Sequence, residues 1–179
     1  SDLTHPKLAN RIIIPDISSG AGLASFGGLV YAGGGDAKNI QPALDLIKTI
    51  DVLKFWKRGA EVGVLFNSGD AAVGLVSAGW CSIFNKGGTK TAFVHPKINA
   101  NQRGVSKKGW LVVIKGSKVP EAANHFINVY LGSEFQNLYA HKSGLTPVNV
   151  PVLEKLGSDD PIVASMKILK ADEVAKMLV

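Results

Sequence analysis

Arg11-Ile-Ile-Ile-Pro-Asp-Ile-Ser-Ser-Gly-Ala-Gly22 is the segment that constrains the architecture most strongly. Its three consecutive isoleucines, stopped by Pro15, predict the end of a buried strand. A turn of mostly small residues follows, and the apolar residues 23–31 predict a helix with Ser18 or Ser19 as its N-cap. Gly33-Gly-Gly35 is expected to end this helix, because glycine tolerates positive φ. The segment therefore predicts a strand, a small-residue turn and a helix.

The same alternation continues along the chain. Apolar residues at helical spacing predict helices over 40–50, 60–67, 120–131 and 133–141, and a helical tail over 161–179. Runs of β-branched and aromatic residues predict strands over 71–76, 91–94 and 110–114. Strands that alternate with helices indicate an α/β fold, with a central and mostly parallel sheet flanked by helices.

Composition excludes several classes of protein. The 179 residues carry a net charge of +6, and 46% of them are hydrophobic. A chain of this size buries roughly 70% of its unfolded surface, which excludes disorder as its main state. Cys81 is the only cysteine, so one chain cannot form a disulfide or a cysteine-based zinc site. The longest apolar run, 110–114, is far shorter than the ~20 residues that span a bilayer.

The turn at Ser18-Ser-Gly20 is the best local candidate for a binding site. Free backbone N–H groups, two hydroxyls and the positive end of a helix could hold a carboxylate, phosphate or phosphonate. The turn lacks the lysine of a P-loop and the glycine spacing of a dinucleotide site, so nucleotide binding is disfavoured. In the alternative interpretation, the serines only cap the helix and the glycines only permit close packing.

Catalytic and metal-binding patterns do not occur, and the sequence predicts neither an enzyme nor a cofactor. The four histidines, His5, His95, His125 and His141, have no motif spacing to a serine, and the elbow Gly-x-Ser-x-Gly is absent. No two histidines lie four residues apart as metal ligands on a helix would. Basic residues are dispersed without interleaved aromatic rings, which disfavours a nucleic-acid partner.

Two tryptophans remain as candidates for contacts with a ligand. Trp80 follows the strand predicted over 71–76, at a position where an α/β sheet opens its ligand crevice. An indole there could stack on a solute or donate its N–H, or it could belong to the core. Trp110 begins a predicted strand beside a polar loop, so it could line a cleft or the edge of the core.

The order of these motifs resembles the second lobe of the extracellular solute-binding proteins of bacterial ABC transporters. The likeness is to the spermidine/putrescine-binding-like group in particular, which has the type II periplasmic-binding-protein fold. It covers nearly the whole chain. The segments that carry it are 2–22, Phe66-Asn-Ser-Gly-Asp-Ala-Ala-Val73, Ala92-Phe-Val-His-Pro-Lys97, 109–118, Val119-Pro-Glu-Ala-Ala-Asn-His-Phe-Ile-Asn128 and Ser143-Gly-Leu-Thr-Pro-Val-Asn149.

The resemblance implies two lobes that close on a solute by a hinge motion. Residues 1–98 would belong to the second lobe, 99–150 to the crossover and the C-terminal part of the first lobe, and 151–179 to helices that pack back on both. The chain would then be a fragment without its leader and without the N-terminal part of the first lobe. The implied partners are a small solute and a transporter permease, in the periplasm or outside the cell, and an exposed hinge face could cause self-association.

The resemblance also implies which residues face the cleft. They are Ser18, Ser19 and Gly20 in the turn and the loop Ala78-Gly79-Trp80. Polyamine binders have an acidic residue where this sequence has Gly109, with Lys107 and Lys108 adjacent. A cationic solute would be repelled there, so with Arg103 in the same loop an anionic or zwitterionic solute is expected.

Two other functions remain open from the sequence. A ligand-sensing effector domain of a transcription regulator can share the two-lobe fold, although no helix-turn-helix segment is visible. A small hydrolase that uses Ser18 or Ser19 would require a nearby base.

Overall fold

β1 (Ile12–Pro15) is the central strand of a small parallel sheet, and the computed structural model describes residues 2–107, 109–156 and 171–178 around it. β2 (Val52–Trp56) pairs with one edge of β1 and β3 (Val73–Gly74) with the other, both in parallel. All four residues of β1 are buried. A strand buried on both faces needs a continuous apolar run, and the isoleucines supply it.

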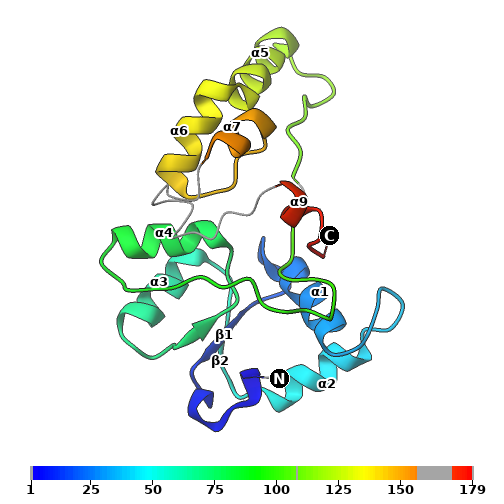
Figure 1. The fold of residues 1–179 in the computed structure, drawn as a ribbon, viewed down its shortest axis with the longest axis vertical. Coiled ribbons are helices and arrows are strands. Elements are labelled where there is room, and N and C mark those ends of the chain that lie inside the picture. Colours follow the sequence, from blue (N-terminus) through cyan, green and yellow to red (C-terminus); the bar gives the residue numbers. More distant parts are fainter. Residues whose placement is uncertain (1, 108, 157–170, 179) are drawn as a thin grey trace.

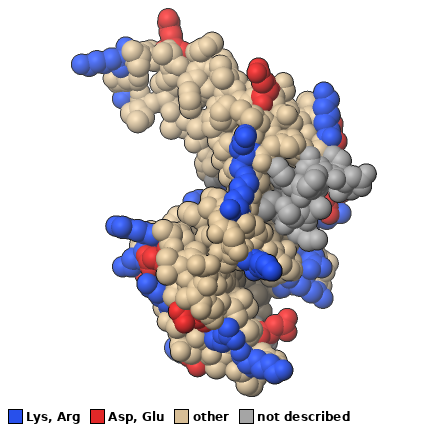
Figure 2. All heavy atoms as spheres, turned by 90° about the vertical axis from the view of Figure 1, so that its left-hand side faces the viewer, with Lys and Arg blue, Asp and Glu red and all other residues tan. Residues whose placement is uncertain are grey.

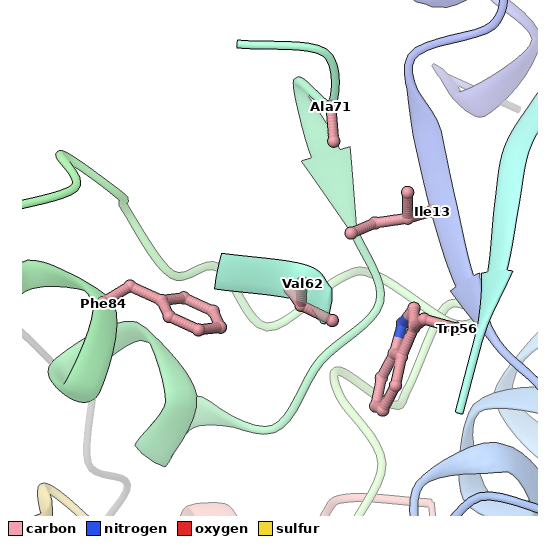
Figure 3. Packing of buried hydrophobic residues seen from close by; sticks show 5 residues of the cluster. All are labelled: Ile13, Trp56, Val62, Ala71 and Phe84. Atoms are coloured by element: carbon pink, nitrogen blue, oxygen red, sulfur yellow. The ribbon is translucent and has the colours of Figure 1, made fainter. Parts of the chain in front are cut away.

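Helices cover both faces of this sheet, as Figure 1 shows. α1 (Gly22–Ala32) and α2 (Gln41–Thr49) lie on one face, where Ile12 and Ile14 pack with Ile50 and Leu46. α3 (Gly59–Asn67) and α4 (Ala78–Lys86) lie on the other face. There Ile13 points at a cluster with Trp56, Val62, Ala71 and Phe84 (Figure 3). The alternation of side chains along β1 thus divides the core between two helical layers.

A helical part stands beyond the sheet in Figure 1. It consists of α5 (Pro120–Leu131), α6 (Ser133–Ser143) and α7 (Val150–Lys155). Gln136 is only 2% exposed and links the segments of this helical part. Its amide donates to the Tyr130 carbonyl and accepts from the Val148 N–H, each at 2.8 Å. A buried amide with partners on both sides ties α6 to the segments before and after it.

Short elements complete the described chain. Two 3-10 turns, Asp2–Thr4 and Pro6–Leu8, precede β1. α9 (Ala171–Val174) lies near the C-terminal end, which returns to the side of α1 in Figure 1. The predicted helical tail is therefore wrong for 175–178, which form a turn and a bridge, and its residues 157–170 lie outside the described part.

Most of the predicted elements are confirmed, and the deviations have physical causes. The serine N-cap is wrong, because α1 is capped at Ala21 without a side-chain hydrogen bond. β2 was not predicted, because Lys54 and exposed Phe55 break its apolar pattern at the sheet edge. The predicted strands over 91–94 and 110–114 have no strand partner among the described residues. Trp110 and Val112 are 78% and 73% exposed, so no neighbouring sheet covers them.

Gly22 allows α1 to begin directly after the serine turn. A Cβ on Gly22 would collide with the carbonyl oxygen of Asp16 and lie 2.6 Å from the Cα of Ile17. Both obstacles are backbone atoms, so they cannot rotate away. Gly27, in the same helix, has open space where its Cβ would be.

The first prediction concerns the core. Ile13→Ala is expected to lower the free energy of unfolding by about 2–5 kcal/mol, because it leaves a cavity at a fully buried site. Ile17→Ala deletes the same atoms from a side chain that is 60% exposed and should cost less than about 0.5 kcal/mol. Urea denaturation followed by circular dichroism measures both, and equal midpoints would contradict this description of the core.

The second prediction concerns the start of α1. Gly22→Ala should lower stability by about 1–3 kcal/mol, since the methyl group forces the backbone of the turn to move. Gly27→Ala should raise it by about 0.5–1 kcal/mol through the higher helix propensity of alanine. Thermal unfolding of the two variants should therefore shift in opposite directions, and a stabilised Gly22→Ala would contradict the close approach.

Candidate functional site

Two loops follow neighbouring strands at the point where the sheet changes its direction of winding. The strand order β2-β1-β3 places β1 and β3 side by side, although α1 after β1 and α4 after β3 lie on opposite faces. Neighbouring parallel strands whose following helices diverge leave a crevice at their carboxyl ends. The serine turn follows β1 and the loop before Trp80 follows β3. Ala21 and Trp80 pack against the same core cluster, so both loops belong to one edge of the sheet.

Asp16 organises the serine turn. Its Oδ1 accepts the Ser18 hydroxyl at 2.6 Å and the Ser18 N–H at 2.9 Å, and its carbonyl accepts the Ser19 N–H at 2.9 Å. The Ser18 hydroxyl, the Ser18 N–H and the charge of Lys57 lower the pKa of Asp16 against partial desolvation. The donors of Ser18 are thus engaged by the protein's own carboxylate. The pattern Asp-x-Ser at a turn is a signal that could have revealed this role of Asp16 in the sequence.

Ser19 and Gly20 differ from Ser18 in this respect. The Ser19 hydroxyl oxygen is buried and has no hydrogen-bond partner in the described part of the chain. Gly20 is exposed, and its carbonyl accepts from Lys107 Nζ at 2.7 Å. Lys107 is distant in sequence, so no local pattern could have placed its ammonium group at the turn. The turn therefore presents a buried hydroxyl beside a lysine.

Trp80 has a structural role and an open edge. Its ring stacks on Phe84 with centroids 5.7 Å apart, and a Cβ on Gly59 would lie 2.5 Å from its Cη2. The indole is thus part of the wall of the core. Its remaining edge lines a cavity of about 210 Å³. The other lining residues come from α4 and its N-terminus, from the last residue of α6 and from the turn after it: Ser77, Gly79, Ile83, Ser143 and Leu145.

A second cavity, of about 230 Å³, lies beside the serine turn. Asp16 stands at its rim, and Phe26, Leu29 and Phe55 are among its apolar walls. At the same edge of the sheet, Trp56 closes β2 and has a buried indole N–H without a partner among the described residues. Sequence reasoning missed Trp56, because β2 itself was missed. Buried donors of this kind usually bind water or a ligand.

Arg103 and Trp110 make no described hydrogen bond to the serine turn. Arg103 Nη2 donates to the His95 carbonyl at 3.3 Å, within its own loop. The Trp110 side chain is largely exposed on an extended segment. Neither residue has a hydrogen bond to Ser18, Ser19 or Gly20 in the described structure. Their proposed contacts with a solute stay predictions.

The surface carries no concentrated charge on the face that Figure 2 shows. Lysines and arginines are scattered over it, with acidic residues between them, and the molecule narrows between the α/β part and the helical part. Within residues 2–107, 109–156 and 171–178, no three His, Cys, Asp or Glu side chains gather as metal ligands would. None of the helices described is both long and apolar enough to cross a bilayer.

Comparison with solved structures places this arrangement among known folds. A protein described as an ABC transporter from Clostridium perfringens ATCC 13124 superposes with a TM-score of 0.62 at 24% identity. The match covers 97% of this chain and 57% of that chain. A protein described as an extracellular solute-binding protein from Bordetella parapertussis gives the same TM-score at 21% identity, over 97% of this chain and 54% of that one. The α/β fold is therefore that of periplasmic binding proteins, and the chain spans a little over half the length of these two structures.

Sequence comparison identifies the family. No curated protein matches the chain. The family model for bacterial extracellular solute-binding proteins matches residues 1–166, which is most of the sequence. The chain belongs to the family of bacterial extracellular solute-binding proteins.

Proposed function

We propose that this chain captures a small solute at the carboxyl edge of its sheet, as the non-catalytic recognition component of an ABC import system. The observation that carries the proposal is that the serine turn and the Trp80 loop follow the neighbouring strands β1 and β3, whose next helices lie on opposite faces of the sheet, and that both loops pack against one core cluster. Crevices at such points are where open α/β sheets bind ligands. The buried Ser19 hydroxyl supports the proposal, because it offers a hydrogen-bonding group that has no partner among the described residues.

The charges around the turn favour a zwitterionic or anionic solute. The Lys107 ammonium group donates to the Gly20 carbonyl, and the N-terminus of α1 adds partial positive charge. An anionic group of the solute would face these two. The Asp16 carboxylate, which is ionised at neutral pH, could face an ammonium group of the same solute. A dication such as putrescine would meet Lys107 instead, so within the spermidine/putrescine-binding-like group this chain would have a different specificity.

A second lobe would complete the site. We assign residues 1–98 to one lobe, 99–150 to the crossover and part of the other lobe, and 151–179 to helices that pack back on both. The uncovered apolar side chains of the helical part support this assignment. α5 has no buried residue, and Phe126 is 60% exposed on it. A lobe equivalent to the part of the two similar structures that this chain does not match would cover these side chains. The whole protein would deliver its solute to a permease outside the cytoplasm.

A titration followed by NMR tests the solute site in the chain as it stands. Adding 2-aminoethylphosphonate should shift the amide signals of Ser19, Gly20 and Ala21 and the indole N–H of Trp80, with weak affinity because one lobe forms half a cleft. Lys107→Gln should weaken binding about fivefold, which corresponds to about 1 kcal/mol for one exposed ionic contact. Lys38→Gln, in the loop at the other end of α1, is the matched control and should change nothing.

Two outcomes would overturn the proposed specificity. One is a putrescine titration that shifts these signals at lower concentration than the phosphonate does. The other is saturable phosphonate binding that shifts only signals remote from both loops.

The uncovered face gives a separate prediction. The isolated chain should self-associate with increasing concentration and bind a hydrophobic dye, because residues 110–114 and α5 expose large apolar side chains. Val112→Lys should reduce both effects. Val64→Lys, at a side chain that is 68% exposed on α3, should not. Sedimentation velocity measures the association, and a wild-type chain that stays monomeric without binding dye would contradict this assignment.

A further inference from the structure

The last described residues of the chain are bonded to the loop that carries Lys107. We name residues 104–107 and 176–178 together the strap. The Ser106 N–H donates to the Leu178 carbonyl at 2.7 Å, and the Leu178 N–H donates to the Gly104 carbonyl at 3.3 Å. Val105 and Leu178 form a parallel bridge. Two segments far apart in sequence are thus joined by backbone hydrogen bonds.

Buried side chains fix the strap in place. Met177 and Leu178 are only 9% and 7% exposed. Gly104 has a φ of +71°, and a Cβ there would lie 2.7 Å from Met177 Cε and 2.9 Å from His95 Nδ1. The Gly104 N–H also donates to the Pro96 carbonyl at 2.7 Å. The methionine therefore sits directly on the backbone of the loop, where only glycine fits.

The strap also rests on α1. Val105 Cγ2 is 2.8 Å from the position that a Cβ on Gly28 would take, so the valine touches the helix backbone at this glycine. α1 begins at the serine turn. One rigid helix therefore connects the base of the strap to the turn that Lys107 reaches.

The position of Lys107 follows from this anchorage. Lys107 comes directly after Ser106, and its Nζ donates a hydrogen bond to the Gly20 carbonyl at 2.7 Å. A lysine side chain has many rotamers, and holding it in one geometry costs entropy. A backbone that is fixed next to the turn reduces the number of directions in which the side chain can extend. Without the strap, the ammonium group would spend most of its time in solvent.

We infer that Met177 and Leu178 are positioning residues, which hold Lys107 against the serine turn through the strap. Through Lys107 they set the affinity of the turn for an anionic group, and this last step rests on the proposed function. Asp16 and Lys57 also carry charge near the turn. Withdrawal of Lys107 removes one positive charge from the turn.

Gly104→Ala tests the strap, and Gly88→Ala is its matched control. Both glycines have positive φ, but a Cβ on Gly88 meets nothing within 4 Å. Gly104→Ala should raise the hydrogen-exchange rate of the Ser106 amide at least about tenfold and shift the amide signals of Gly20 and Ala21. Gly88→Ala should do neither. Met177→Ala, which removes the anchor without adding strain, should reproduce the effect if Gly104→Ala does not fold.

Binding of 2-aminoethylphosphonate gives the second readout. Gly104→Ala should weaken it about as much as Lys107→Gln does, and the double variant should be no weaker than either single variant, because both act through one ammonium group. Additive losses would overturn the inference. So would unchanged Gly20 and Ala21 signals in both Gly104→Ala and Met177→Ala. A wild-type chain that binds no phosphonate while the exchange and shift changes occur would refute the proposed function and leave the strap supported.

Discussion

β1 has a parallel strand on each edge and helices on both faces, so all four of its residues are buried from water. The two neighbouring strands run in the same direction as β1, and the connections between parallel strands return through helices. As a result, the carboxyl ends of all three strands lie at one edge. The serine turn and the Trp80 loop both lie at that end of the sheet, because each of them follows one of these strands.

The same constraint does not extend to the helical part. α5, α6 and α7 are held together by a buried glutamine amide and by ring contacts such as that between Tyr130 and Phe135, at 4.7 Å. They have no sheet of their own among the described residues. The α/β part therefore has a core divided between two layers, whereas the helical part has one covered side. This asymmetry fits a chain that spans a little over half the length of two structures with its fold.

Local patterns predicted the elements that local interactions determine. The isoleucine run predicted β1, and apolar spacing predicted α2, α3, α5 and α6. β2 was not predicted, because an edge strand needs only a partial apolar pattern and Lys54 can be exposed there. The strands predicted over 91–94 and 110–114 are not formed, because a strand needs a neighbouring strand and none lies beside these segments in the described part of the chain. At the site, the turn was recognised from its small residues, but the use of Ser18 by Asp16 and the arrival of Lys107 depend on contacts that spacing does not encode.

The three tryptophans experience three different surroundings. Trp56 is buried at the end of β2, Trp80 is half-buried against Phe84, and Trp110 is 78% exposed. Indole emission moves to shorter wavelength when the ring leaves water. Trp110 consequently serves as a built-in optical probe of its own face. Any molecule that covers residues 110–114 would shift the emission maximum of Trp110 and leave the emission of Trp56 and Trp80 unchanged.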